Sequence, residues 1–364
     1  MKQHETRPLI SERAAALTPY TPGEQPQDRS YIKLNTNENP YPPAPSVQEY
    51  LRSAEADRLR LYPDPESTEV RMALSETFGL SEDSFFLGNG SDEVLSFIFY
   101  AFFDRSRGPL LFPEHTYSFY PVYCSFYDIP YRRIPLTNEL FIDPGEYRKI
   151  TETRNVTGII FPNPNAPTGA ALSRDSIEEL METVPGEVPI VIDEAYVDFG
   201  ADSCLPLIGR YGNLIVVHTF SKNRSLAGMR IGYAAASEEL IRVLNMVKNS
   251  FNSYPVNRIG QEVAVRALRE SEYFEECRRN IMATRERTVE QLRGEGWYVV
   301  PSKANFFFTR HPELSGKEVY TRLKEDGILV RYFGHKGIED FVRISIGTEE
   351  EMERLVEALR GLRP

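Results

Sequence analysis

The sequence predicts an α/β protein with a large domain, in which a mostly parallel sheet lies between helices, and a smaller α+β domain. Three short apolar runs, at residues 157–161, 189–192 and 213–220, are predicted strands. Residues 172–182, between the first two runs, have the apolar spacing of a helix, and Ser173 is a suitable N-cap. Continuous apolar strands that alternate with helices are typical of a parallel sheet buried on both faces.

The 364 residues correspond to roughly two domains at about 150 residues each. We assign the polar, proline-containing residues 1–30 to an N-terminal arm, because they show no sustained apolar pattern. Residues 31–260 contain the apolar strands and are expected to form the large domain. Residues 261–364 are expected to form the smaller domain, after a helical pattern that covers 237–293. There, predicted strands alternate with helices at 316–325 and 349–361; the strands lie at 297–300, 305–309, 327–330 and 341–346.

Composition and charge argue against several classes of function. Lys and Arg total 42 against 53 for Asp and Glu, and the net charge of −11 disfavours nucleic-acid binding. No apolar run approaches the roughly 20 residues of a membrane helix, and residues 1–20 lack the apolar core of a secretory signal. Three widely spaced cysteines and five histidines without ligand spacing indicate neither a disulfide framework nor a zinc site. We therefore expect a cytoplasmic protein with no metal ion, no membrane partner and no nucleic-acid partner.

Polar residues follow each of the three predicted buried strands. The amide-containing segment 163–169 follows the first strand, and Asp193 and Tyr196 follow the second. Lys222 follows the third strand, with Arg230 eight residues later. Ligands of open α/β sheets bind outside the carboxyl ends of the strands, so these side chains should meet at one edge. Each alone is more often a capping or surface residue, but together they predict a site, and a lysine in such a crevice suits Schiff-base chemistry.

Seven motifs, spread over roughly residues 17–347, resemble the fold-type I pyridoxal-phosphate enzymes of the aminotransferase class I and II family. The resemblance is strongest to the histidinol-phosphate aminotransferases. It implies their fold, with a large cofactor-binding domain. The motifs are LNTNENP at 34–40, YPDP at 62–65, GNGSDE at 88–93, NPNAPTG at 163–169, DEAY at 193–196, SK at 221–222 with Arg230, and VRISIG at 342–347.

The resemblance implies pyridoxal 5'-phosphate as the cofactor. It implies that Lys222 binds the cofactor covalently and moves a proton between the cofactor and the substrate's α-carbon. Asp193 is expected to keep the pyridine nitrogen protonated, which strengthens the ring as an electron sink. Tyr196 is expected to form a hydrogen bond with the cofactor's phenolic oxygen, and Tyr117 to stack on the ring. The aromatic density around Tyr117 is also typical of a core segment.

The cofactor's phosphate is expected to bind at the start of the apolar helical run that follows residues 88–93. Free backbone N–H groups and the helix dipole bind phosphate at such termini, and here those groups belong to Ser91 and Asp92. By the same resemblance, Ser221 and Arg230 would complete the phosphate site.

One position departs from the family pattern. The family usually has an asparagine directly before Pro-Thr-Gly, where it contacts the phenolic oxygen, and this chain has Ala166 there. Asn165, one residue earlier, is expected to reach the same atom and is kept as a cofactor-binding residue.

For the substrate, the resemblance implies Arg343 as the bidentate partner of a carboxylate or phosphate, with Arg331 as a second arginine. Tyr20 matches an arm tyrosine that contacts substrate, and Asn37 and Asn305 are candidate residues of the pocket wall. For each of these, an ordinary structural role is the alternative.

Assembly is expected to contribute to the site. Tyr62 matches a tyrosine that the neighbouring subunit supplies in the family, and long arms often reach a partner subunit. We therefore expect a homodimer in which Tyr62 and the arm cross to the partner.

These residues favour transamination of L-histidinol phosphate with 2-oxoglutarate, giving imidazole-acetol phosphate and L-glutamate in histidine biosynthesis. An aromatic amino acid aminotransferase and a threonine-phosphate decarboxylase remain alternatives. Discrimination among these amino donors depends on pocket shape and a few polar contacts, which sequence does not reveal.

Overall fold

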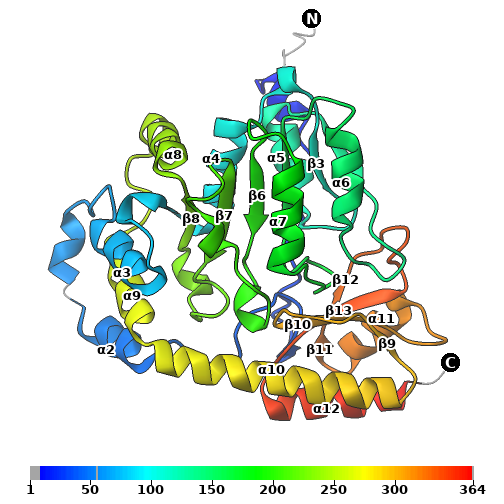
Figure 1. The fold of residues 1–364 in the computed structure, drawn as a ribbon. Coiled ribbons are helices and arrows are strands. Elements are labelled where there is room, and N and C mark those ends of the chain that lie inside the picture. Colours follow the sequence, from blue (N-terminus) through cyan, green and yellow to red (C-terminus); the bar gives the residue numbers. More distant parts are fainter. Residues whose placement is uncertain (1–8, 55, 363–364) are drawn as a thin grey trace, which may run out of the picture.

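The computed structural model describes residues 9–54 and 56–362 (Figure 1). In that part of the chain, seven strands form the larger sheet, and its inner strands are apolar and buried on both faces, whereas the edge strand at residues 131–134 is largely exposed. Strand β8 is antiparallel to both of its neighbours, and all other neighbours are parallel. The spatial order is β2 (Phe85–Gly88), β8 (Gly232–Ala236), β7 (Leu214–Thr219), β6 (Ile190–Asp193), β5 (Gly158–Pro162), β3 (Leu110–Pro113) and β4 (Tyr131–Ile134).

Helices cover both faces of the larger sheet, which confirms the predicted layers (Figure 1). Successive residues of β5 enter different cores, with Ile159 on one face and Ile160 on the other. The core with Ile160 includes α4 (Gly90–Phe102), α5 (Phe119–Tyr127) and α8 (Glu238–Phe251). The core with Ile159 includes α2 (Pro45–Ser53), α3 (Thr68–Phe78), α6 (Pro144–Thr151), α7 (Arg174–Thr183) and α9 (Arg258–Arg269).

The remaining strands form two smaller sheets among the described residues. Strands β1 (Ile32–Lys33) and β11 (Ile328–Leu329) pair in parallel. The other sheet is antiparallel and has the order β12 (Arg331–Tyr332), β13 (Phe341–Ser345), β10 (Phe306–Arg310) and β9 (Tyr298–Val299). Figure 1 shows the helices α10 (Ser271–Gly294) and α12 (Glu349–Gly361) side by side beneath it, with α11 (Gly316–Glu325) beside its strands.

The cores do not follow the predicted domain boundaries. Val263 and Phe274 belong to the core of the larger sheet, so the predicted boundary at residue 260 is too early and the change occurs within α10. At the other end, Ile32 pairs with Ile328, and Leu34 enters the core of the smaller domain. Residues just after 30 therefore pack with the C-terminal part, because strand pairing joins segments that lie far apart in sequence.

The described part of the N-terminal arm packs on its own chain. The Arg331 guanidinium donates to the carbonyls of Thr21 (3.1 Å) and Pro22 (3.3 Å), and Glu24 bonds with Lys324 and Tyr320. These contacts hold the segment 21–24 against its own chain; that the arm also reaches a partner subunit stays a prediction, and residues 1–8 lie outside the described residues.

The remaining helices are short. Helix α1 covers Glu12–Ala15, and short 3-10 helices connect the larger elements. Within the described residues, no helix has the length and apolar character needed to span a membrane. The 3-10 helices are Ala56–Arg60, Glu82–Ser84, Arg105–Arg107, Val197–Phe199, Leu205–Leu207 and Ala227–Met229.

Candidate active site

A cavity lies at the carboxyl ends of β6 and β7, between the larger sheet and the smaller antiparallel sheet. Asp193 ends β6, and Ser221 and Lys222 follow β7. From the opposite side, Arg331 of β12 and Arg343 of β13 line the same cavity. The structure thus brings together side chains that sequence reasoning placed at one sheet edge, and adds two cations from the smaller domain.

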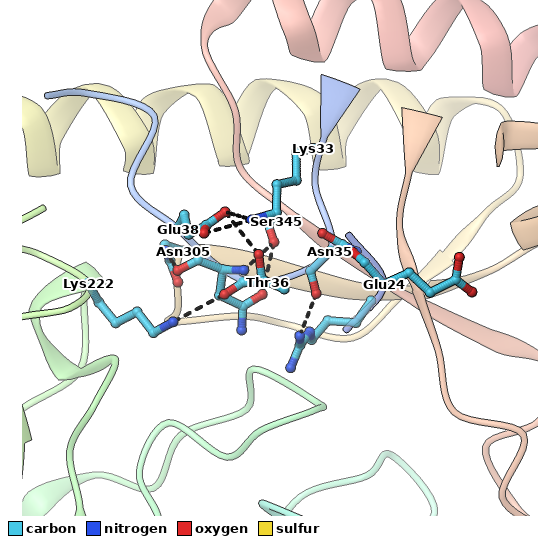
Figure 2. A network of polar contacts seen from close by, with 10 residues as sticks. Glu24, Lys33, Asn35, Thr36, Glu38, Lys222, Asn305 and Ser345 are labelled. Atoms are coloured by element: carbon cyan, nitrogen blue, oxygen red, sulfur yellow. Dashed lines mark hydrogen bonds and ion pairs between the residues drawn. The ribbon is translucent and has the colours of Figure 1, made fainter. Parts of the chain in front are cut away.

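Lys222 reaches across the cavity toward the segment 35–39. Its Nζ donates to the carbonyl of Thr36 at 3.2 Å (Figure 2). The same atom lies 5.6 Å from the ring centre of Tyr196. Asn39 Nδ2 donates to the backbone carbonyl of Lys222 (3.0 Å), which fixes the loop after β7. Within the described residues, the hydrogen-bond partner of the amine is thus a neutral carbonyl, and the lysine lines the cavity, as a lysine that reacts with a bound carbonyl must.

Asp193 is a buried carboxylate, only 4% exposed. Its Oδ2 accepts from the hydroxyl of Tyr120 (3.1 Å) and its Oδ1 from the backbone N–H of Ala195 (3.2 Å). Burial raises the pKa of Asp193 to about 6, although these two donors act in the opposite direction. Because water no longer solvates the charge, a cationic group bound against this carboxylate would be strongly favoured.

The start of α4 lies beside Arg230, and the two together are suited to bind an anion. The helix begins without a side-chain cap, so its first backbone N–H groups, including those of Ser91 and Asp92, have no intrahelical acceptor. Arg230 Nη2 contacts Asp92 Oδ2 at 2.8 Å. Two glycines permit this approach, since a Cβ on Gly90 would lie 2.5 Å from Arg230 Nη2, and one on Gly232 would lie 2.3 Å from Ser91 N.

Aromatic side chains form another part of the cavity wall. Tyr117 lines the cavity and its hydroxyl donates to Asp92 Oδ1 (2.7 Å). Burial and the neighbouring carboxylate raise the pKa of Tyr117 well above its usual value, so it remains a neutral donor. Tyr20 of the arm also lines the cavity and packs on Phe119 with ring centres 4.5 Å apart.

The two arginines are directly opposite each other on neighbouring strands. Arg343 Nη2 donates to the carbonyl of Asn35 (3.0 Å), and its buried Nε has no partner among the described residues. Burial lowers the pKa of Arg343, and its guanidinium lies 5.2 Å from the Phe306 ring and 5.5 Å from the Phe333 ring. With a free donor and few polar neighbours, this cation is suited to an anionic substrate group.

Besides Tyr62, three predicted site residues do not line the cavity. Asn165 Nδ2 donates to the carbonyl of His115 (3.0 Å), away from the cavity, and Ala166 faces it instead. The reason is the tight turn, in which neighbouring side chains point in different directions. Asn37 and Asn305 lie behind the wall, where Asn305 Nδ2 donates to the carbonyl of Asn37 (3.0 Å). These asparagines therefore lie behind the residues of the cavity wall, and their direct contact with a ligand stays a prediction.

Tyr62 lies outside the cavity of its own chain. Its side chain is 78% exposed and stacks on Tyr254 with ring centres 4.7 Å apart. Arg258 Nη2 donates to the carbonyl of Tyr62 (2.7 Å) and holds this loop on the surface. Its contact with a partner's site stays a prediction.

Sequence reasoning missed two contributors. Tyr120 donates to Asp193, but it lies in an aromatic-rich segment where every ring also fits a core. Phe333 lines the cavity beside Arg343, yet it stands in a turn without a recognisable motif.

Comparisons with known proteins agree with this geometry. A family model described as aminotransferase class I and II matches residues 29–359. A histidinol-phosphate aminotransferase of Syntrophus aciditrophicus is 53% identical, over 97% of this chain and 98% of that one. One of Chromohalobacter salexigens is 52% identical, over 95% and 96%. The same fold occurs in the histidinol-phosphate aminotransferase from Sinorhizobium meliloti solved in complex with pyridoxal-5'-phosphate, with a TM-score of 0.89, 24% identity, and coverage of 99% and 100%.

Proposed function

Because the chain belongs to the aminotransferase class I and II family, we propose that it is a pyridoxal-phosphate-dependent histidinol-phosphate transaminase. It transfers the amino group of L-histidinol phosphate to 2-oxoglutarate, giving imidazole-acetol phosphate and L-glutamate in histidine biosynthesis. The observation that carries this proposal is one cavity that holds Lys222, the buried Asp193 and two arginines. The names of relatives 46–53% identical to the chain support the choice of substrate.

The residues present fit the cofactor. Asp193 offers a desolvated carboxylate to a protonated ring nitrogen. The first N–H groups of α4, with Ser221 and Arg230, offer donors to a phosphate. Tyr117 and Tyr196 both line the cavity, which supports a role for Tyr117 against the ring and for Tyr196 in a hydrogen bond with the phenolic oxygen.

The bound cofactor supplies an electron sink for negative charge at the substrate's α-carbon. Lys222 Nζ would hold the cofactor and then accept and return the proton of that carbon. Asp193 would keep a proton on the ring nitrogen. Arg343 would bind the substrate's carboxylate or phosphate as a planar fork, with Arg331 and Tyr20 on the same side. One cavity with these arginines can bind glutamate and a phosphorylated amine in turn.

A homodimer and a cytoplasmic location complete the proposal. The exposed Tyr62 and Tyr254 pair supports a subunit contact, because it presents aromatic surface outside the chain's own site. Cys124, Cys204 and Cys277 are free thiols in the structure, which supports a reducing compartment.

Half-reactions of the holoenzyme test the function. Mixed separately with histidinol phosphate and glutamate, the protein should rapidly lose the visible absorbance of its bound cofactor, and phenylalanine should react slowly. Lys222→Ala should abolish both turnover and the visible absorbance band of the cofactor bound to the lysine. A preference for phenylalanine would indicate an aromatic transaminase. If glutamate leaves the band unchanged and threonine phosphate releases carbon dioxide, the enzyme is a lyase.

A further inference from the structure

Behind the cavity wall, a chain of hydrogen bonds joins the smaller sheet to Tyr196. Ser345 ends β13 and is buried. The backbone N–H of Asn37 donates to Ser345 Oγ (2.8 Å), and the Ser345 hydroxyl donates to Asn37 Oδ1 (2.9 Å). Asn37 Nδ2 in turn donates to the hydroxyl oxygen of Tyr196 (3.1 Å). A residue of β13 thereby contacts the cavity wall through a single asparagine.

The Ser345 hydroxyl determines which way the Asn37 amide points. Ser345 Oγ already accepts the backbone N–H of Asn37, so its own buried hydrogen needs a separate acceptor. Asn37 Oδ1 is that acceptor. A reversed amide would set its NH₂ group against Ser345 and leave the hydroxyl hydrogen unpaired. The amide NH₂ therefore faces Tyr196.

This orientation fixes the direction of the Tyr196 hydroxyl. Because its oxygen accepts from Asn37, its hydrogen is left for an acceptor elsewhere, and Tyr196 lines the cavity. With the opposite amide orientation, Tyr196 would donate to Asn37 and offer only an acceptor to a ligand. Ser345 thus determines whether the Tyr196 hydroxyl acts as a donor or only as an acceptor toward the cavity, although Ser345 does not contact Tyr196 directly.

The backbone around Asn37 is held from several sides. Asn37 has a φ of +54°, in the left-handed region that asparagine tolerates better than most residues. Asn305 Nδ2 donates to its carbonyl, and the neighbouring Thr36 carbonyl accepts from Lys222. Figure 2 shows Ser345 and Asn305 together beside Thr36, with the Lys222 amine pointing toward them. The donor to Tyr196 is therefore fixed before any ligand binds.

We propose that Ser345 is a positioning residue that, through Asn37, keeps Tyr196 as a hydrogen-bond donor to the ligand oxygen it faces. This inference rests on the proposed function, in which that oxygen is the cofactor's phenolic oxygen. A hydrogen bond donated to an anionic oxygen stabilises the anion, so it lowers the pKa of the lysine-bound cofactor.

A spectrophotometric pH titration of the holoenzyme tests the proposal. Ser345→Ala should raise the pKa of the bound chromophore by roughly half a unit to one unit, as expected for one misdirected hydrogen bond. Tyr196→Phe should raise it further. In the Tyr196→Phe background, Ser345→Ala should add no shift, because the group through which it acts is absent. Ser345→Thr keeps the hydroxyl, so its chromophore pKa should equal that of the unaltered protein.

Thr309→Val is the matched control. Thr309 is a buried hydroxyl of the adjacent strand β10 and donates to the carbonyl of Tyr298 (2.9 Å), away from Tyr196. Thr309→Val removes one buried hydrogen bond, as Ser345→Ala does, but it should leave the pKa of the chromophore unchanged. An equal Ser345→Ala shift in both backgrounds, or no shift in the otherwise unaltered chain, overturns the proposal.

A second measurement separates this inference from the proposed function. If the purified chain binds no pyridoxal phosphate, the proposed function fails, but the network is still testable in the cofactor-free chain. There, the losses in melting temperature from Ser345→Ala and Tyr196→Phe should combine to less than their sum. Strictly additive losses would show that the two residues are not linked.

Discussion

At the scale of single residues, Asp193 gives the cofactor-free chain a pH-dependent stability. Its pKa is raised from 3.8 to about 6 by burial, so folding favours the protonated acid. The resulting contribution of Asp193 to the free energy of unfolding is complete below about pH 3.8 and is lost as the pH rises through about 6. The shift corresponds to about 3 kcal/mol. We expect the cofactor-free chain to lose this much unfolding free energy between pH 4 and 7, relative to Asp193→Asn.

Urea unfolding of both proteins across that range measures the difference. The asparagine oxygen can still accept from the N–H of Ala195, and its NH₂ group can donate to the hydroxyl oxygen of Tyr120, so the variant keeps both partners with one hydrogen bond reversed and removes the charge. Saturating cofactor should reduce the pH-dependence, because a protonated ring nitrogen compensates the carboxylate. A constant difference between the two proteins from pH 4 to 7 would mean that water or a shifted neighbour already solvates Asp193.

Residue types and strand ends predicted the positions of Asp193 and Lys222, because a buried parallel strand delivers the side chains at its carboxyl end to the crevice. The direction of a side chain in a turn could not be predicted in the same way. Asn165 and Ala166 are neighbours, and the backbone of their turn decides which one faces the cavity. Asn37 is similar, since its left-handed conformation turns it toward Ser345.

At the scale of elements, Gly232 of β8 permits a close contact with the start of α4, where we propose that the cofactor's phosphate binds. A Cβ on Gly232 would lie 2.3 Å from the backbone nitrogen of Ser91, so backbone must move. We expect Gly232→Ala to destabilise the fold by about 1–3 kcal/mol and to weaken binding of pyridoxal phosphate at least tenfold. Thermal unfolding and equilibrium titration measure the two effects. Gly212→Ala, where a Cβ meets nothing within 4 Å, is the control and should change neither.

Helix bounds were predictable where the signal is local. The segments 316–325 and 349–361 coincide with α11 and α12, and each begins with a capping box, Ser315 with Glu318 and Thr348 with Glu351. Strand partners were not predictable in this way. The pairing of β1 with β11 joins residues almost 300 positions apart, and no local pattern encodes it.

At the scale of the whole molecule, the arm and Tyr62 differ in what they contribute to a dimer. The arm near Thr21 is bonded to its own chain by Arg331, so it closes its own cavity. Tyr62 points away from that cavity and is held on the surface. If Tyr62 completes a cofactor-binding site, that site therefore belongs to another subunit, which a two-fold symmetric dimer supplies reciprocally.

Mixing two defective variants tests this arrangement. Lys222→Ala chains cannot hold the cofactor covalently, and Tyr62→Phe chains should bind it about tenfold more weakly, for one lost hydrogen bond to a charged group. In a mixed dimer, the Lys222 of one chain and the Tyr62 of the other form one intact site. After dissociation and reassociation of equal amounts, roughly a quarter of all sites should be intact if subunits combine at random.

The assay is performed at a cofactor concentration that saturates the unaltered protein but not Tyr62→Phe. Mixed dimers should then show lysine-dependent absorbance and turnover above the sum of the two separate variants. Mixing unaltered chains with Lys222→Ala controls for losses during reassociation. If the mixture does no better than its components while this control recovers, Tyr62 acts within its own chain or not at all, and its surface position then serves only the contact with Tyr254.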